Sequence, residues 1–261
     1  MVMKRKAGKP DLGAAPKEII KEAYDGLDSE GRRVFLKQTL TLGAMVAASG
    51  VVLSGPRSVQ AVLDGMSRWN DRAQGWLFDP DKLAPEYPRS MITKPFPFNA
   101  YYDESEVPVI DGRTYKLELG GLVRDKRSWT LDALYKLPQV SQVTRHICVE
   151  GWSAIGEWGG VPLGHFLKRI GADTTAKYVG FQCADGYYTS LDMPSALHPQ
   201  TLLSLSYAGK VLPVDRGYPV KIRVATKLGF KNPKHVVGLW VTNKYPGGYW
   251  EDQGYNWFSG S

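Results

Sequence analysis

The sequence has few cysteines and few histidines. Its 261 residues include two cysteines and four histidines. It contains no H-E-x-x-H zinc motif, no nucleotide-binding glycine loop and no Ser-His-Asp order. A C-x-x-C-H haem attachment site is also absent, so we expect no covalently bound haem in this chain. These absences argue against a zinc protease of this type, a nucleotide-binding enzyme and a serine hydrolase.

Most of the chain also has little net positive charge. The formal charge is +7, but residues 1–61 hold ten Lys/Arg and six Asp/Glu, while residues 62–261 hold 23 and 20. No basic run or stripe of alternating basic and aromatic residues occurs after residue 61. Both features argue against a nucleic-acid-binding protein.

The N-terminal region has the features of an export signal. Arg32 and Arg33 are followed by Val-Phe-Leu-Lys, then by an uncharged, Gly- and Ala-rich run at 39–55. The sequence "SVQA" ending at Ala61 fits a cleavage site with small residues. This region resembles a twin-arginine signal, which implies export to the periplasm after folding and cofactor insertion. The alternative is a retained membrane anchor, although about 17 residues are few for a span of about 20.

The body, residues 62–261, has the pattern of an α+β fold. A short helix and a proline-rich extended segment are expected before residue 100. Strands are expected at 113–123, 140–152, 201–213, 218–225 and 234–245, with a hairpin at 176–191 and helices at 129–138 and 161–171. Strands and short helices do not alternate regularly, which argues against a doubly wound sheet.

The two cysteines allow several interpretations. In the strand at 140–152, Thr144, His146 and Cys148 share one face, and Arg145 lies on the other. In an oxidising compartment Cys148 and Cys183 could form a disulfide, or either could be an inert core residue. Cys148 could instead be a metal thiolate held at a rigid strand end.

Several motifs together resemble the sulfite oxidase superfamily. They are "RHICVEGW" at 145–152, Leu-Pro followed by Gly-x-Pro-Val at 212–220, and "KLGFK" at 227–231, in that order. The similarity extends over roughly residues 90–245 and is greatest to the small periplasmic branch that includes methionine-sulfoxide reductases. It implies a mixed-sheet molybdopterin-binding domain with molybdenum-molybdopterin as cofactor.

The resemblance also assigns residues to the site. It implies that Cys148 ligates molybdenum. His146, on the same strand face, could orient the pterin or a substrate oxygen, or could be a core histidine bonded to the backbone. Pterin contacts are implied for Asn99, Tyr102, Asp103, Cys183, Arg216, Lys221, Asn232, Pro233 and Lys234. Lys227, Lys231 and Lys234 lie around Gly229 in a loop suited to a phosphate tail, although the residues alone fit a solvated basic turn better. Arg216 stands where relatives can have an amide, Lys221 where they can have arginine, and Cys183 where they can have a hydroxyl.

The expected reaction is two-electron oxygen-atom transfer. A sulfite oxidase needs cations beside the metal, but this chain has Glu150 and Trp152 after Cys148. Reduction of S-oxides or N-oxides is therefore the prediction, with electrons from an external partner such as a membrane haem protein. The alternatives are sulfite oxidation, a metal-free periplasmic binding protein stapled by a disulfide, and an anchored structural protein.

Overall fold

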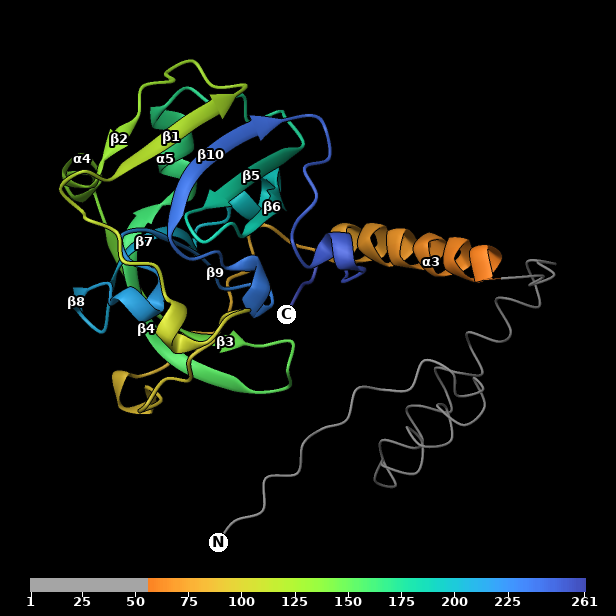
Figure 1. Cartoon of the computed structure of the whole chain (residues 1–261), viewed down its shortest axis with the longest axis horizontal. Helices are drawn as coiled ribbons and strands as arrows, with labels where there is room; N and C mark the ends of the chain where they lie inside the picture. Colours follow the sequence, from red (N-terminus) through yellow and green to blue (C-terminus); the bar gives the residue numbers. More distant parts are fainter. Residues whose placement is uncertain (1–55) are drawn as a thin grey trace, which may run out of the picture. The chain divides into compact units, whose positions relative to one another are not determined.

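Two five-stranded sheets organise the described part of the chain, residues 56–261 of the computed structural model (Figure 1). The first sheet has the order β2-β1-β10-β5-β6. Its strands are β1 (Lys116–Gly121), β2 (Trp129–Thr130), β5 (Tyr178–Cys183), β6 (Tyr188–Asp192) and β10 (Val236–Thr242). Only the β1–β10 pair is parallel, and the other pairs are antiparallel.

The second sheet carries the segment that contains the predicted metal ligand. Its order is β3-β4-β7-β8, and β9 also pairs with β7. Its strands are β3 (Val140–Ile147), β4 (Ser153–Pro162), β7 (Thr201–Tyr207), β8 (Lys210–Val211) and β9 (Lys221–Val224). All its pairings are antiparallel. The absence of regular strand–helix alternation in residues 56–261 confirms the α+β prediction.

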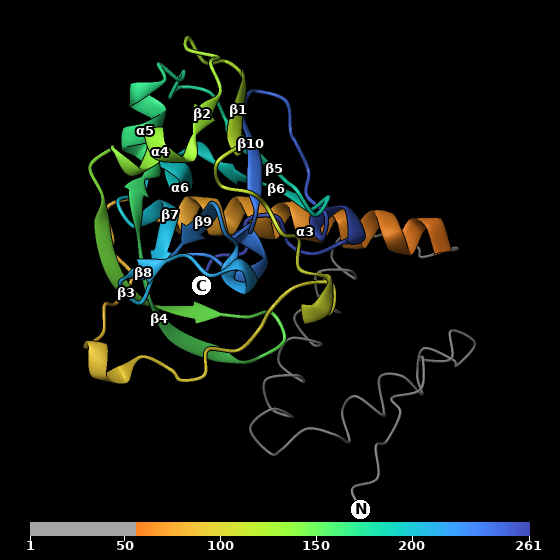
Figure 2. The same cartoon turned by 60° about the vertical axis from the view of Figure 1, so that its left-hand side comes forward.

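Helices and 3-10 turns connect the strands (Figure 2). The α-helices are α3 (Pro56–Leu77), α4 (Leu131–Tyr135), α5 (Leu163–Arg169) and α6 (Met193–Leu197). The 3-10 helices are η1 (Arg89–Met91), η2 (Glu104–Glu106), η3 (Val214–Arg216), η4 (Gly229–Lys231) and η5 (Glu251–Gln253). None of the described helices is long and apolar enough to cross a membrane.

Local sequence signals placed most of these elements correctly. The Thr130 hydroxyl caps α4 by accepting from Ala133 N at 3.2 Å. The four apolar residues predicted on the inner face of 161–171 are fully buried: Leu163, Phe166, Leu167 and Ile170. The turn at Asp185 and Gly186 joins β5 to β6, as the hairpin prediction requires.

One strand was missed, and two expected elements differ in extent. β4 was not predicted, because glycines at 156, 159 and 160 and Pro162 hide its pattern. The expected strand at 201–213 is two strands, because Ala208 and Gly209 both have positive φ and form a tight turn. The short helix expected before residue 100 is the 22-residue α3.

Helix α3 also crosses the predicted boundary at Ala61. It begins at Pro56, so the proposed cleavage site lies within its first turns. The twin-arginine pair and the apolar run at 39–55 lie outside the described residues, so the export signal and its cleavage stay predictions. Residues 62–261 form one compact unit.

The core of that unit brings the two sheets and α5 together. Its buried apolar residues include Leu117 and Val241 from one sheet and Leu203 and Ile222 from the other. A smaller cluster beside β4 contains Phe96, Ala154, Trp158 and Leu212. Ala154 of this cluster pairs with His146 near the end of β3, two residues before Cys148.

Candidate active site

A tight turn after β3 presents the Cys148 thiol. The buried face of β3 carries Gln142, Thr144 and His146, whereas Arg145 is exposed on the other face, as strand alternation predicts. Gly151 N donates to Cys148 O at 3.2 Å, and Cys148 N donates to Trp152 O at 2.9 Å. Two backbone hydrogen bonds therefore fix the residue immediately beyond the strand.

Glu150 shapes the electrostatic surroundings of this thiol. Its Oε2 atom lies 3.6 Å from Cys148 Sγ and accepts from Trp152 Nε1 at 2.9 Å. Burial raises the pKa of the Cys148 thiol, and the neighbouring carboxylate adds to the rise. A thiolate here therefore needs a compensating cation, which a bound metal would supply.

His146 is buried behind the turn. The Asn99 amide lies 3.3 Å from its Nε2 atom, while Nδ1 has no hydrogen-bond partner among the described residues. Burial, aided by nearby cations such as Arg223, lowers the pKa of His146 well below its usual value. Gly229 approaches the ring so closely that a Cβ there would lie 2.7 Å from Nε2. The ring is therefore neutral and is packed against the loop at 229–234.

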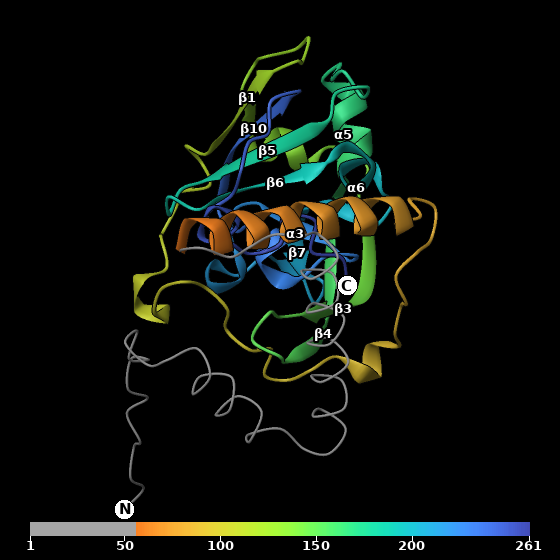
Figure 3. The ribbon, with the colours of Figure 1, turned by 90° about the vertical axis from the view of Figure 1, so that its right-hand side faces the viewer.

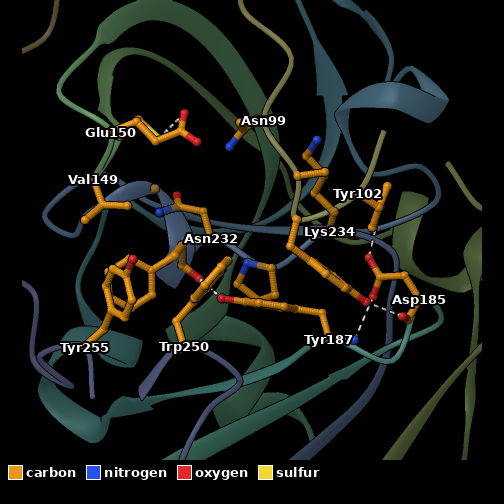
Figure 4. A pocket seen from close by; sticks show the side chains of 16 residues that line it. Asn99, Tyr102, Val149, Glu150, Asp185, Tyr187, Asn232, Lys234, Trp250 and Tyr255 are labelled. Carbon is orange, nitrogen blue, oxygen red and sulfur yellow. Dashed lines mark hydrogen bonds between the residues drawn. The ribbon is translucent and has the colours of Figure 1, made fainter. Parts of the chain in front are cut away.

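A cavity opens beside Cys148 between segments that are far apart in sequence. Figure 4 shows Asn99 and Glu150 on one side, with Tyr187, Trp250 and Tyr255 across from them. The complete lining is Asn99–Tyr102, Cys148–Glu150, Asp185, Tyr187, Gly229, Phe230, Asn232–Lys234, Trp250 and Tyr255. Six of these residues are aromatic, and the charged ones are two acids and one lysine.

Six of the predicted site residues meet at this cavity: Asn99, Tyr102, Cys148, Asn232, Pro233 and Lys234. The Tyr102 hydroxyl donates to Asp185 Oδ2 at 3.0 Å, and Lys234 Nζ donates to Asp215 O at 2.8 Å. Burial lowers the pKa of Lys234 to about 8. Its ammonium group is the one charged donor on the cavity wall.

The other five predicted residues lie outside the wall, and one of them is His146, which is buried behind the turn. Asp103 caps η2, and Cys183 is buried in the hydrophobic core. Arg216 donates to Pro97 O at 2.7 Å and Phe96 O at 2.5 Å. Lys221 Nζ donates to Asn232 O at 3.0 Å. Arg216 and Lys221 therefore support the segments that form the wall, and neither lines the cavity itself.

The proposed lysine cluster does not form. Lys227 lies 3.4 Å from Asp192, with its ammonium over the Phe258 ring, and Lys231 Nζ donates to Glu251 at 2.5 Å. Of the three predicted lysines, only Lys234 reaches the cavity. The other two hold the C-terminal segment and β6 instead.

Arg223 was not predicted, although it is central to the site. It is fully buried and donates to Asn232 Oδ1 at 2.8 Å and to Thr144 Oγ1 at 3.1 Å. It also donates to Arg145 O at 2.7 Å, so it joins β3 to the loop at 229–234. The signal was present in the sequence as an arginine inside the apolar strand "VKIRVA". The aromatic wall had no such signal, because its members come from five separate segments.

Comparison with known proteins identifies the family. Residues 104–250 match the oxidoreductase molybdopterin binding domain. The chain belongs to this family. A relative from Azospira oryzae, named putative protein-methionine-sulfoxide reductase subunit YedZ1, is 59% identical over 94% of each chain. The protein is therefore a molybdopterin-dependent oxidoreductase, and the alternatives of a disulfide-stapled binding protein and an anchored structural protein are not supported. Both described cysteines are free.

More distant similarities extend the comparison. The protein-methionine-sulfoxide reductase catalytic subunit MsrP of Xanthomonas axonopodis is 34% identical over 59% of this chain and 56% of that one. The Burkholderia mallei MsrP is 36% identical over 52% of this chain and 46% of that one. The match thus spans about half the length of these two relatives. The sulfane dehydrogenase SoxCD of Paracoccus pantotrophus shares the fold, with a TM-score of 0.50, 21% identity, and coverage of 53% and 40%.

The residues at the cavity fit the cofactor of this family. Cys148 supplies a partly exposed soft donor, and His146 Nδ1 is a buried polar atom without a partner among the described residues. Gly229 allows close approach of the backbone, and Lys234 offers an ammonium for an anionic tail. No group of three or more His, Cys, Asp or Glu that could hold a metal by itself occurs in the described residues, so the protein's hold on a metal would rest on Cys148 together with the pterin.

Proposed function

We propose that this protein is an exported molybdenum-molybdopterin enzyme that reduces S-oxides, with methionine sulfoxide as its substrate. The observation that supports this best is the cavity wall beside Cys148, which has six aromatic side chains but only one cation. Sulfoxides are neutral and carry apolar substituents, so aromatic surfaces suit them. The names of the relatives point to the same chemistry for those proteins.

A sulfite-binding site would require a different charge distribution. Sulfite is a small anion and needs several converging cations. Here Glu150 contacts the thiol, and Asp185 lines the same cavity. The nearest candidate cation in sequence, Arg145, is exposed on the opposite strand face and lies over the Tyr87 ring at 5.3 Å. This arrangement disfavours the alternative of sulfite oxidation.

In the proposed reaction a sulfoxide takes up two electrons and two protons, its S–O bond breaks, and a thioether and water form. The molybdenum cofactor, when bound, supplies the two-electron oxygen-atom transfer. Cys148 would hold the metal through its thiolate, while Asn99, Tyr102, Asn232, Pro233 and Lys234 would hold the pterin. The aromatic residues would bind the apolar part of the substrate and limit water in the cavity.

Supporting contacts would keep these groups in place. Arg223 holds the Asn232 side chain, and Lys221 holds its carbonyl. Glu150 accepts from the Trp152 indole and lies 3.6 Å from the Cys148 thiol, so it links these two side chains. Such preorganisation matters because small misplacements of a reacting group cost much of the rate.

The test compares substrates on one molybdenum-loaded preparation with an artificial electron donor. We expect turnover of methionine sulfoxide and related S-oxides, and little oxidation of sulfite. Tyr255→Ala, which shortens the aromatic wall, should raise KM for sulfoxides by about tenfold, consistent with the loss of one large apolar contact. Tyr245→Ala is the matched control, since Tyr245 is exposed and outside the cavity lining. Fast sulfite turnover without S-oxide reduction would contradict the proposal.

The electrons and the location require two further proposals. The sequence has no haem attachment site, so we infer that a separate redox protein, of which a membrane haem protein is an example, supplies the electrons. The word "subunit" in the name of the Azospira relative supports such an assembly.

We also infer periplasmic export by the twin-arginine route. Arg32→Lys with Arg33→Lys should keep the protein in the cytoplasm, as cell fractionation would show; normal export of this variant would refute the signal assignment.

A further inference from the structure

The two sides of helix α3 differ in character. On one side, Asp71 Oδ1 accepts from Asn256 Nδ2 and from Phe258 N, each at 2.7 Å. Gln74 Oε1 accepts from Gly260 N at 3.1 Å. These bonds attach the C-terminal half of α3 to the segment at 256–260. The orientation of the helix is therefore fixed by named contacts.

The other side of α3 exposes large apolar side chains. Trp69 is 62% exposed, Trp76 is 85% exposed and Leu77 is 71% exposed. The two tryptophans are seven residues apart, so they lie two turns apart along one face. Figure 3 shows this helix on the surface that faces the viewer. The indoles thus project away from the bonds made by Asp71 and Gln74.

Positive charge borders these indoles. Arg68 and Arg72 are both exposed, and Arg72 lies between the tryptophans in sequence. Asp71 is the one acidic residue within 65–77, and its carboxylate is occupied by the hydrogen bonds to the segment at 256–260. We call Arg68, Trp69, Arg72, Trp76 and Leu77 the outer stripe of α3.

The combination of tryptophan and arginine is characteristic of a membrane–water interface. Indole rings favour the headgroup level, and basic side chains are attracted to anionic lipid. A helix that lies in the interface has an apolar stripe but little overall hydrophobicity. α3 fits this description, since it is amphipathic and, like the other described helices, cannot span a membrane.

The sequence before α3 supports the same partner. The uncharged apolar run at 39–55 directly precedes Pro56, the first residue of the helix. If this run stays attached to the chain and enters a membrane, the helix that follows must start near the lipid surface. The basic border suits an anionic surface, and the apolar run, where it is retained, would bring a bilayer to the start of the helix.

We propose that the outer stripe of α3 binds the surface of an anionic phospholipid membrane. The two indoles insert at the headgroup level, and Arg68 and Arg72 pair with lipid phosphates. The contact holds the oxidoreductase unit beside the bilayer, where a membrane-bound electron donor would reach it. The lipid contact itself does not depend on the substrate proposed above.

The first test measures binding of the full chain to vesicles of phosphatidylglycerol and phosphatidylcholine by sedimentation. Arg68→Gln with Arg72→Gln should weaken binding about thirtyfold, because each basic residue near an anionic surface contributes about fivefold. The control is Arg113→Gln with Arg127→Gln, which removes the same charge from exposed arginines paired with Asp111 and Asp125. Equal binding by the two double variants would overturn the proposal.

The second test separates the outer stripe from the apolar run. Brominated phospholipids quench indoles that lie at the bilayer surface. Wild-type protein should lose part of its fluorescence on these vesicles, and Trp69→Phe with Trp76→Phe should remove that loss, leaving the signal of the other six tryptophans. Equal quenching of both proteins would overturn the proposal whatever the arginines contribute. Self-association that protects the indoles without lipid would identify a second copy as the partner and would also overturn it.

Discussion

Cys148 and Cys183 carry the same side chain, but their positions in the fold give the two thiols different roles. Cys148 follows the last residue of β3 and borders the cavity, whereas Cys183 ends β5 inside the hydrophobic core. Burial raises the pKa of both thiols, and for Cys183 it raises the pKa far above the usual value. A buried thiol of this kind is inert, while a partly exposed one can ligate a metal.

This contrast leads to a prediction for two conservative variants. Cys148→Ser should lose activity and alter the molybdenum signal without a change in thermal stability, because a hydroxyl is a poor substitute for a soft thiolate. Cys183→Ser should keep its activity per molybdenum but lose about 1–3 kcal/mol of stability, since it buries a hydroxyl in an apolar core. Elemental analysis, activity assays and thermal melts distinguish the two. Full activity in Cys148→Ser would disprove the ligand assignment.

Sequence patterns predicted a residue's position correctly where that position depends on residues adjacent in sequence. Strand alternation correctly placed His146 and Arg145 on opposite faces of β3, and the structure buries the first and exposes the second. It failed for Lys227 and Lys231, whose partners Asp192 and Glu251 are distant in sequence. Three lysines in one loop indicate a cluster only if no acid elsewhere competes for them, and local spacing cannot show this.

At the scale of elements, β4 explains what the pattern could not reveal. Its glycines lower strand propensity, but they are required by close packing. At Gly160, an added Cβ would lie 2.0 Å from Leu203 O of β7. The β4–β7 register also shifts between Gly159 and Gly160. The glycines of β4 therefore hide the strand from sequence analysis, and the same glycines let the backbones of β4 and β7 approach each other.

Two alanine variants test this account of β4. Gly160→Ala should destabilise the fold by about 1–3 kcal/mol or more, because the backbone of β7 cannot move aside easily. Gly120→Ala in β1 is the control, since its Cβ would meet Trp240 Cβ at an ordinary 3.5 Å. Denaturant unfolding should show a lower midpoint for the first variant only. Equal midpoints would mean that β4 and β7 tolerate a wider separation.

At the scale of the whole molecule, the buried lysines link stability to pH. Burial lowers the pKa of Lys227 to about 7 and that of Lys234 to about 8. It also lowers the pKa of Lys231, and that of Lys221 well below its usual value. In the unfolded chain these lysines have a pKa of about 10.4. Between the lowered pKa values of the folded protein and the ordinary lysine pKa, the unfolded chain binds more protons than the folded protein. The free energy of unfolding therefore rises with pH in this range.

Buried tyrosines and thiols oppose this trend at higher pH. Burial raises the pKa of Tyr101 to about 12 and raises the pKa of Cys183 well above its usual value. Above about pH 9–10 the unfolded chain therefore loses protons that the folded protein keeps, and the free energy of unfolding falls. Together the two sets of groups predict a stability maximum on the alkaline side of neutrality.

We expect the free energy of unfolding to increase from pH 7 to pH 9, with each buried lysine contributing at most about 1.4 kcal/mol per pH unit. Lys227→Met should reduce this slope, because the variant has no ammonium to desolvate and Lys227 lies outside the cavity. Lys210→Met, at an exposed position on β8, is the control and should leave the slope unchanged. Denaturant unfolding of the cofactor-loaded protein at several pH values measures all three slopes. An identical slope in wild type and Lys227→Met would show that Lys227 stays protonated in the folded protein, with Asp192 offsetting the cost of burial.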